Sequence, residues 1–462
     1  MPKDITALLD PASVAVIGAS ADPCKIGGRP IDYMRRLGFP GRVVGVNPAR
    51  REIQGLPCMP DIAAAGVIDL AIIATPQEAA EAAVLACLKA GVRGLILFTA
   101  GYAEMGPEGR RAQQRLTDAV GDAGAVLLGP NCLGTVNVPG RMAATFATTL
   151  ERLDPKPGGF SYVGQSGALG SYWLEMATAA GLGIAKWITT GNEAHVTGAD
   201  AIAYLVADTD TRIIGTYIED IKAPDEFAAA AQAARHTRKT IIAIKAGRSA
   251  AGTRAAAAHT ASRTGDAAWY EDFLAECGVI QVSSVTEMID VARLAVAAPA
   301  ARAYGATRIG MVTVSGGASV LVCDAAAEHG LAMAALSLED CAELRSFLPS
   351  YAPAANPIDV TGAVVSDRGL LPRALKILGH CADCDVLLLF YGGMASIADD
   401  LIAAARDAAA YGKPVIVIWM AGPATALAAI TALGMPVFTD IPPAIAAIAR
   451  LRTVSSLTGG PL

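Results

Sequence analysis

The chain reads Ser13-Val-Ala-Val-Ile17-Gly18-Ala-Ser20-Ala-Asp-Pro-Cys-Lys25-Ile-Gly27-Gly28, a mainly apolar run followed by a turn that contains glycine. A short, continuous apolar run is typical of a strand that is buried on both faces of a parallel sheet. The glycines after it allow backbone N–H groups to approach a phosphate at the N-terminus of the next helix. The stretch therefore predicts the first strand and turn of a Rossmann-like unit.

The same pattern of apolar run, turn and helical segment recurs along the whole chain, which predicts parallel sheets with helices on both faces. It is interrupted at Thr149–Gly159, with two prolines, and at Ala297–Ala306, which is rich in Ala and Pro. We therefore predict an α/β protein with a Rossmann-like domain (1–145) followed by two related flavodoxin-like, doubly wound parallel-sheet domains (155–298 and 305–462). The predicted strands are 13–17, 42–46, 69–73, 94–98 and 125–128; then 160–163, 184–188, 212–218 and 240–246; then 308–314, 385–391 and 414–420.

Hydrophobic residues make up 53% of the 462 residues and charged residues only 17%. Such a chain forms two or three domains, and we expect a partner subunit to cover part of its apolar surface. The net charge of −6 gives no reason to expect a nucleic acid or an anionic membrane as partner. The uncharged stretch 414–439 is interrupted by Gly422-Pro423 and Gly434, so we interpret it as strand, helix and strand rather than as a membrane span.

Nine cysteines are scattered without the spacing of a disulfide framework, and no apolar signal segment follows Met1-Pro-Lys-Asp4. Both features favour reduced thiols and a cytoplasmic location. The single C-x-x-C, Cys381-Ala-Asp-Cys384, has no second pair beside it. A zinc or redox site there is the minor alternative, and we expect no metal site.

His259 lies in a segment punctuated by Arg and Gly that follows the buried-strand pattern Thr240–Ala246. Neutral imidazole is a good nucleophile near neutral pH and can carry a phosphoryl group covalently. Arginines 248, 254 and 263 could attract the phosphate that it would receive. The segment predicts a phosphohistidine, and the alternative is an exposed histidine in a loop.

Two further features follow strands of the same block. Gln165-Ser166-Gly167 opens a helix, which favours anion binding, and Glu219 follows the strand that ends at Ile218. Because the carboxyl ends of parallel strands meet at one edge of a sheet, we expect both features near His259. A carboxylate can fix the imidazole tautomer so that the other nitrogen attacks phosphorus. The alternative for Glu219 is a helix cap or an ion pair with Lys222.

The first block has no complete G-x-G-x-x-G, and Asn47 stands where an NAD enzyme usually places Asp or Glu. Nucleotide binding is therefore predicted, whereas nicotinamide chemistry is disfavoured. Lys25, Arg50 and Arg51 are available for phosphates, or are ordinary solvated charges. Three more turns should line the same cleft, namely 75–77, 99–102 and 129–134.

In the third block Val314-Ser-Gly-Gly317 precedes a helix, and Asn356-Pro-Ile-Asp359 follows at a distance. Both segments could line a small-molecule site, and equally they could be a tight turn and a helix cap. Gly247-x-x-x-x-Gly252-Thr253 resembles half of a P-loop but lacks its Lys-Ser/Thr pair. An independent nucleotide hydrolase is therefore not expected.

Taken together, the chain resembles the α subunit of NDP-forming (ADP-forming) acyl-CoA synthetases, relatives of succinyl-CoA synthetase. The resemblance covers nearly the whole chain, and its specificity comes from the joint order and spacing of short motifs that are individually weak. These are Val16-Ile-Gly-Ala-Ser20, Val46-Asn-Pro48, Gly129-Pro-Asn-Cys-Leu-Gly134, Gln165-Ser-Gly-Ala-Leu-Gly170, Gly191-Asn-Glu193, Tyr217-Ile-Glu219, His259-Thr260 and Asn356-Pro-Ile-Asp359.

The resemblance implies residue roles and a reaction. His259 would be the phosphohistidine, Glu219 its stabilising partner, and Gln165, Ser166 and Gly167 the phosphate cradle. A carboxylic acid and the phosphohistidine would give an acyl phosphate, which the CoA thiolate then attacks. ATP or ADP, with Mg, would bind an ATP-grasp domain on a partner β subunit, so a hetero-oligomer is implied. CoA would lie along Gly18, Ala19, Ser20, Lys25, Asn47, Pro48, Thr75, Pro76, Ala100, Gly101 and Asn131, and the acid would contact Ser315, Gly316, Gly317, Asn356 or Asp359.

One residue departs from the family pattern, because Ala261 replaces the glycine of His-Thr-Gly. A methyl group there could narrow the approach of the backbone to phosphate. Two other functions compete with the ligase: a non-catalytic CoA-binding regulatory or scaffold subunit, and a nicotinamide-dependent oxidoreductase, which Asn47 opposes. The sequence leaves open the identity of the acid, the choice of ATP or GTP, the direction of the reaction and the subunit stoichiometry.

Overall fold

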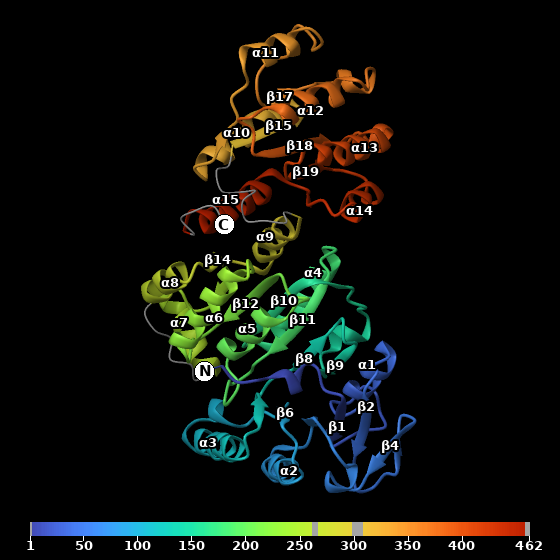
Figure 1. Ribbon diagram of the computed structural model, residues 1–462, viewed down its shortest axis with the longest axis vertical. Coiled ribbons are helices and arrows are strands. Elements are labelled where there is room, and N and C mark those ends of the chain that lie inside the picture. Colours follow the sequence, from blue (N-terminus) through green and yellow to red (C-terminus); the bar gives the residue numbers. More distant parts are fainter. Residues whose placement is uncertain (1, 261–266, 298–307, 458–462) are drawn as a thin grey trace. The chain divides into compact units, whose positions relative to one another are not determined.

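The computed structural model describes residues 2–260, 267–297 and 308–457 (Figure 1). The chain divides into two compact units, Met1–Val285 and Thr286–Leu462, and each is described by itself. The first unit contains two sheets and the second unit contains one, all flanked by helices (Figure 1).

The first sheet has the strand order β3-β4-β2-β1-β5-β6-β7, and its pairs are parallel except for the hairpin of β3 and β4. Every residue of β1 is buried, as expected for a central strand with helices on both faces. The strands are β1 (Ser13–Ile17), β2 (Arg42–Val46), β3 (Glu52–Ile53), β4 (Leu56–Met59), β5 (Leu70–Ile73), β6 (Gly94–Leu97) and β7 (Val126–Leu128), and the helices are α1 (Arg29–Leu37), α2 (Gln77–Lys89) and α3 (Pro107–Asp122).

The second sheet has the order β14-β13-β12-β10-β11-β8-β9. Its five parallel strands follow the flavodoxin-like order, in which the second strand of the unit lies outside the first. Antiparallel β8 and β9 extend it beyond β11. The elements are β8 (Gly134–Asn137), β9 (Met142–Thr145), β10 (Pro157–Gly164), α4 (Gly167–Ala179), β11 (Ile184–Thr189), α5 (Gly198–Ala207), β12 (Ile213–Ile218), α6 (Pro224–His236), β13 (Thr240–Lys245), α7 (Ala250–Thr260), α8 (Ala267–Glu276) and β14 (Ile280–Val282).

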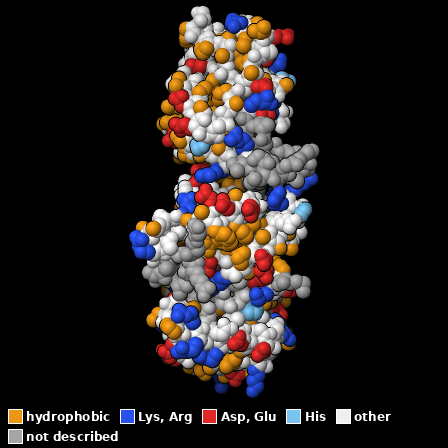
Figure 2. Space-filling model, turned by 90° about the vertical axis from the view of Figure 1, so that its left-hand side faces the viewer, with side chains coloured by type: hydrophobic (Ala, Val, Ile, Leu, Met, Phe, Trp, Pro, Cys, Tyr) orange, Lys and Arg blue, Asp and Glu red, His pale blue; other side chains and the backbone are white. Residues whose placement is uncertain are grey.

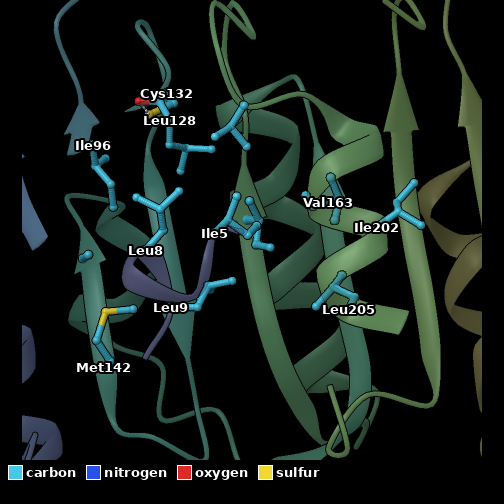
Figure 3. Packing of buried hydrophobic residues seen from close by; sticks show 14 of the residues in the cluster. Ile5, Leu8, Leu9, Ile96, Leu128, Cys132, Met142, Val163, Ile202 and Leu205 are labelled. Carbon is cyan, nitrogen blue, oxygen red and sulfur yellow. Dashed lines mark hydrogen bonds between the residues drawn. The ribbon is translucent and has the colours of Figure 1, made fainter. Parts of the chain in front are cut away.

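The two sheets of the first unit share one continuous hydrophobic core. Figure 3 shows side chains of the N-terminal segment, among them Ile5 and Leu8, between Ile96 of β6 and Val163 of β10. Thr135 Oγ1 on β8 donates to the carbonyl of Leu8 over 2.8 Å, which ties the same segment to the second sheet. Because a fully buried aliphatic side chain stabilises a protein by about 1.5–3 kcal/mol, this shared core holds the two sheets in a fixed relation.

The second unit repeats the flavodoxin-like order as β16-β15-β18-β19-β20, with β17 paired to β15. The uncharged stretch 414–439 forms β19, α14 and β20, as its sequence predicts, and no helix in the described part of the chain is long and apolar enough to cross a membrane. The elements are α9 (Val285–Ala297), β15 (Arg308–Thr313), α10 (Gly316–Glu328), β16 (Ala332–Met333), α11 (Leu338–Arg345), β17 (Ile358–Asp359), α12 (Leu370–His380), β18 (Val386–Gly392), α13 (Ala398–Ala408), β19 (Val415–Met420), α14 (Ala424–Ala432), β20 (Val437–Phe438) and α15 (Ile441–Leu457).

Two elements lie differently from the predicted domain limits. Strands β8 and β9 fall within residues 1–145 but hydrogen-bond to the second sheet through β11. Helix α9 falls within residues 155–298 but, from Thr286 on, belongs to the second unit, where Arg293 Nη1 donates to the carbonyl of Val437 over 2.9 Å. The domain limits themselves stay a prediction.

Charged side chains of both signs are interspersed on the face of the molecule drawn in Figure 2, with hydrophobic side chains between them. This mixture agrees with the small net charge of −6. A face of this kind lacks the single-sign field that steers a protein to a polyanion.

Candidate active site at the carboxyl edge of the second sheet

Gln165 and Glu219 lie side by side because their strands do. β10 and β12 are parallel neighbours, with Gly164 paired to Tyr217, so the residues that follow both strands emerge at one edge. The Gln165 side chain fixes this arrangement. Its Oε1 accepts from the backbone N–H groups of Glu219 (2.5 Å) and Asp220 (3.0 Å), and its Nε2 donates to the Asp220 carbonyl (2.9 Å).

Ser166 and Gly167 form the N-terminus of α4. Ser166 is the N-cap, and its Oγ accepts from the backbone N–H of Leu169 over 3.3 Å. Gly167 lies so close to Leu133 that an added Cβ would come within 2.7 Å of the leucine Cγ, which explains the absence of a side chain. The remaining N–H groups of the first turn and the helix dipole favour an anion at this point.

The Glu219 side chain is only 6% exposed. Burial, and next to it the charge of Glu219, raises the pKa of Tyr217. Lys222 does not pair with Glu219 in the described structure, since its ammonium group donates instead to the carbonyls of Asn192 and Glu193. The ion-pair alternative for Glu219 with Lys222 is therefore wrong.

A buried lysine supports the same edge from β13. Lys245 Nζ donates to the carbonyl of Glu219 over 2.9 Å and lies 4.1 Å from the centre of the Tyr270 ring. The Tyr270 hydroxyl donates to Asp220 Oδ1 over 2.9 Å. Burial lowers the pKa of Lys245, while the charges of Asp220 and Glu219 oppose this shift. The backbone at Glu219 is thus held from both sides, by Gln165 and by Lys245.

Glu193 is a site residue to which the sequence analysis assigned no role. Its side chain is 5% exposed, and its Oε1 accepts from Thr190 Oγ1 (2.8 Å) and from the backbone N–H of Gly198 (3.0 Å). Burial raises the pKa of Glu193 to about 7, although Lys222 and these hydrogen bonds act against the shift. A small pocket at the carboxyl edge is lined by Glu193, Gln165, Gly198, Tyr217 and Lys222 among others. Gly191-Asn-Glu193 was visible in the sequence only as a motif of the resemblance.

His259 lies on α7, which follows β13, the neighbour of β12 in the sheet. The segment is thus helical up to Thr260 rather than an open loop. The side chain of His259 lies outside the described part of the structure, as do Ala261 and Arg263 in full. The backbone of α7 contacts the short 3₁₀ helix η3 (Ala103–Met105), which lies between β6 of the first sheet and α3. The pairing of His259 with Glu219 stays a prediction.

The first-sheet turn that starts at Gly18 is held by side chains from β2 and from the β3–β4 hairpin. Asn47 Nδ2 donates to the carbonyl of Ala19 over 3.0 Å, so the residue that opposed NAD binding has a structural use of its own. Gln54, which the sequence analysis missed, donates through Nε2 to the carbonyls of Ser20 (3.0 Å) and Gly28 (3.1 Å). Gly18 has φ +83°, and a Cβ there would meet the Ala74 carbonyl at 2.9 Å.

The other predicted CoA residues follow β2, β5, β6 and β7 at the carboxyl edge of the same sheet. The Thr75 hydroxyl oxygen is buried and has no hydrogen-bond partner, which suits a ligand group. Gln77 Nε2 donates to the Gly101 carbonyl over 2.7 Å, and the Asn131 backbone N–H donates to the Thr99 carbonyl over 3.1 Å. The structure places Lys25 and Pro76 at the surface and Pro48 and Ala100 in the loops around them, with Arg50 and Arg51 exposed nearby.

In the second unit the structure brings some of the predicted acid-binding residues together. Asp359 is 9% exposed, its Oδ1 accepts from the Thr361 backbone N–H over 2.8 Å, and its Oδ2 faces Gly316 at the start of α10. Burial raises the pKa of Asp359. Ser315 is the N-cap residue of α10 but makes no side-chain cap hydrogen bond. Gly317 is exposed in the first turn of α10.

The Asn356 side chain has a structural role, because its amide oxygen and its amide nitrogen both hydrogen-bond to backbone groups. Oδ1 accepts from the Met311 N–H over 2.9 Å, and Nδ2 donates to the carbonyls of Ile309 (2.8 Å) and Ala334 (2.9 Å). The side chain therefore joins β15 to the segment after β16. Cys381 and Cys384 are free thiols, and the described residues contain no cluster of three or more His, Cys, Asp or Glu that could hold a metal.

Comparisons with known protein families cover most of the chain. Residues 12–137 match the family described as CoA binding domain, residues 157–295 match the succinyl-CoA ligase like flavodoxin domain, and residues 309–368 match the Ligase-CoA domain. The fold and these matches define a CoA ligase of the succinyl-CoA synthetase type.

Individual relatives narrow this class. The chain is 34% identical to the α subunit of acetate–CoA ligase [ADP-forming] II from Pyrococcus furiosus over 422 residues, which cover 89% of each chain. It is 33% identical to acetate–CoA ligase [ADP-forming] I from Archaeoglobus fulgidus. That alignment covers 98% of this chain and 64% of the relative. The dinucleotide-forming acetyl-coenzyme A synthetase 1 of Ca. Korarchaeum cryptofilum, solved with phosphate and ADP, superposes with a TM-score of 0.88 at 30% identity and covers 98% of this chain and 97% of that one.

The chain belongs to the family of ADP-forming acyl-CoA synthetases. This membership confirms the predicted fold class, with a CoA-binding domain and flavodoxin-like domains, and the predicted class of function. The roles of individual residues are not settled by it and are taken up as proposals.

Proposed function

We propose that this chain converts a small carboxylic acid and CoA to an acyl-CoA at the expense of ATP, through a phosphohistidine at His259 and an acyl phosphate. The observation that carries the proposal is the meeting of the α4 N-terminus, Gln165 and buried Glu219 at the edge of the second sheet, directly beside the strand that precedes α7. This edge offers backbone donors for a phosphoryl group and a carboxylate to orient an imidazole.

The reaction divides into three balanced transfers. An imidazole nitrogen of His259 attacks the γ-phosphorus of ATP, and ADP leaves. The carboxylate oxygen of the acid then attacks the phosphohistidine, which forms the acyl phosphate and frees the imidazole. Finally the CoA thiolate attacks the acyl carbon, the thioester forms, and inorganic phosphate leaves. In each step the α4 N-terminus would stabilise the charge on the phosphoryl oxygens.

CoA would bind at the first-sheet turns, where Gly18–Ser20 and Thr75 present backbone groups and an unpartnered hydroxyl. The acid would contact Ser315, Gly316 and Asp359 in the second unit, which the structure brings together, whereas the amide of Asn356 serves the backbone. The nine cysteines are all free, which agrees with our proposal of a cytoplasmic location.

We further propose an ATP-grasp partner subunit that binds ATP with Mg and forms a hetero-oligomer with this chain. The relative from Pyrococcus furiosus is named as an α subunit, whereas the relative from Archaeoglobus fulgidus is a longer single chain. These two arrangements support an additional protein part beyond this chain, which is either a separate subunit or fused to the same polypeptide. In the separate arrangement the partner would cover apolar surface such as Tyr172 and Met176, which lie exposed on α4.

Labelling with [γ-³²P]ATP tests the proposal. The chain is co-expressed with an ATP-grasp subunit, and we expect label on this chain that is stable in base and labile in acid, and that acid plus CoA removes. H259A should abolish the label, whereas H236A, a change of an exposed histidine on α6, should retain it. Equal labelling of H259A would show the phosphohistidine to be wrong. CoA binding without label or turnover would support the regulatory subunit instead.

A further inference from the structure

Asn192 connects the two sheets of the first unit. It lies in the loop between β11 and α5, one residue before the buried Glu193. Its side-chain Nδ2 donates to Glu104 Oε2 over 2.5 Å and to Gln113 Oε1 over 3.1 Å, and both acceptors belong to the first-sheet domain. Its Oδ1 accepts from Asn131 Nδ2 over 3.2 Å. All polar atoms of this side chain therefore face the predicted CoA-binding half.

Glu104 in turn accepts hydrogen bonds from the loop after β6. Its Oε1 accepts from the backbone N–H groups of Gly101 (2.6 Å) and Tyr102 (3.2 Å), while Oε2 faces Asn192. Burial acts to raise the pKa of Glu104, but the hydrogen bonds from Gly101 and Asn192 outweigh it and lower the pKa. The ionised carboxylate thus shapes a loop that contains a predicted CoA contact.

The backbone of Asn192 contacts a residue that lines the small pocket at the carboxyl edge of the second sheet. Its carbonyl accepts from Lys222 Nζ, which also donates to the Glu193 carbonyl over 3.2 Å, and Lys222 and Glu193 both line the pocket beside Gln165. Its N–H donates to the Pro130 carbonyl over 2.9 Å. Asn192 therefore contacts both the first-sheet loops that would hold CoA and Lys222, which lines the small pocket of the second sheet.

We propose that Asn192 is a positioning residue which, through Glu104, holds the Gly101 loop in register with the carboxyl edge of the second sheet, where Gln165 and Glu219 lie, so that the CoA thiol meets the acyl group where it is formed. The inference rests on the proposed function. The hydrogen bonds of the Asn192 side chain go to Glu104, Gln113 and Asn131, and none of these residues belongs to the proposed phosphate cradle of Gln165, Ser166 and Gly167. This Asn192–Glu104 bridge should therefore act on the CoA step and leave the transfer of phosphate from ATP to the protein unchanged.

The polarity of the bridge can be reversed. E104Q keeps an oxygen for the Gly101 and Tyr102 N–H groups and turns an NH₂ toward Asn192, so donor meets donor. N192D places a carboxylate opposite Glu104, so acceptor meets acceptor. The double variant E104Q/N192D pairs the new NH₂ with the new carboxylate and restores a hydrogen bond. E108Q changes an exposed glutamate in the first turn of α3 and is the matched control.

Two readouts are measured on the full chain with its ATP-grasp partner: the CoA dissociation constant by calorimetry, and single-turnover loss of ³²P label on addition of acid plus CoA. Each single variant should raise the CoA dissociation constant about fivefold or more and slow the CoA-dependent step about tenfold or more, because small misplacements of reacting groups cost that much. Labelling by ATP should stay within about twofold of wild type, and the double variant should recover most of both losses.

Three results overturn the inference: single variants with wild-type CoA affinity and CoA step, equal losses in labelling and in the CoA step, or a double variant as impaired as the sum of the singles. A wild-type chain that takes no label refutes the proposed function. In that event the CoA dissociation constants of wild type, E104Q, N192D and the double variant still decide whether the Asn192–Glu104 contact positions the Gly101 loop for CoA.

Discussion

Glu193 provides the sharpest test of the electrostatics in the small pocket at the carboxyl edge of the second sheet. We consider the change of Glu193 to Gln, which removes the charge and keeps the shape. The amide oxygen of E193Q retains the role of Oε1, which accepts from Thr190 Oγ1 and the Gly198 N–H. The substitution therefore isolates the effect of burying a negative charge in a side chain that is 5% exposed.

The magnitude follows from the two pKa values. Burial raises the pKa of Glu193 from its usual 4.5 to about 7, so the folded protein binds the proton more tightly than the unfolded chain does. The free energy of unfolding of wild type therefore falls as the pH rises from about 4.5 through about 7, and levels off above that range. Between about pH 5 and about pH 8 this loss is about 2–3 kcal/mol, and E193Q does not undergo it.

The assay is urea-induced unfolding of wild type and E193Q at about pH 5 and about pH 8, in the same buffer ions. The difference in free energy of unfolding between the two proteins should change by about 2–3 kcal/mol in favour of E193Q at the higher pH. E175Q, at an exposed glutamate on α4, should follow wild type at both values. If wild type and E193Q lose stability in parallel over this range, the carboxylate is not buried as an acid with a raised pKa, and the reasoning fails.

Three further substitutions have defined consequences for unfolding by urea. G191A places a Cβ 2.4 Å from the Asn131 carbonyl at a residue with φ +59°, so we expect a loss of at least about 2 kcal/mol, and a smaller loss would show that the loop can move. K186M leaves Asp208, 3.3 Å from the buried ammonium, without its cation, so we expect a loss of about 3–5 kcal/mol, and a stable variant would contradict the buried pair. T197A removes half of the capping box of α5 and should cost about 1 kcal/mol, whereas no change would make the cap irrelevant.

The fold was largely predictable because strand and helix differ in local pattern. The apolar runs at Ser13–Ile17 and Val386–Tyr391 are uniformly buried, and each lies in the middle of its sheet. The turn residues after Ile17 were predictable for the same reason, since glycines mark close approach of the backbone. Strands β8 and β9 were not found, because Gly134–Asn137 and Met142–Thr145 contain small and polar residues whose burial depends on strand pairing, of β8 with β11 and of β9 with β8.

The site was predictable only in part, since its geometry depends on contacts that are distant in the sequence. Gln165 was expected to cradle phosphate, but its side chain fixes the backbone at Glu219 and Asp220, more than fifty residues away. Asn47 was expected to oppose NAD and, by the resemblance, to contact CoA, whereas its side chain in the structure donates to the Ala19 carbonyl and so holds the Gly18 turn. Glu193 was visible only as part of the motif Gly191-Asn-Glu193, and nothing local indicated its burial, which depends on Thr190 and the start of α5.

The two flavodoxin-like copies explain why we assign phosphoryl transfer to the first one. Strand β12 is followed by Glu219 and Asp220, whereas β18, at the equivalent place in the second copy, ends at Gly392 and continues with Gly393. The glycines after β18 supply backbone groups but no carboxylate, and Trp419 Nε1 already donates to the Gly393 carbonyl over 2.8 Å. The carboxylate at this edge of the second copy is Asp359, which follows β17 and faces Gly316 at the start of α10. In the first copy β13 leads into α7 and His259, whereas the segment 421–436 after β19, the equivalent strand, contains no histidine. The second copy keeps a helix N-terminus and a carboxylate but lacks the imidazole, which suits recognition of a substrate rather than covalent chemistry.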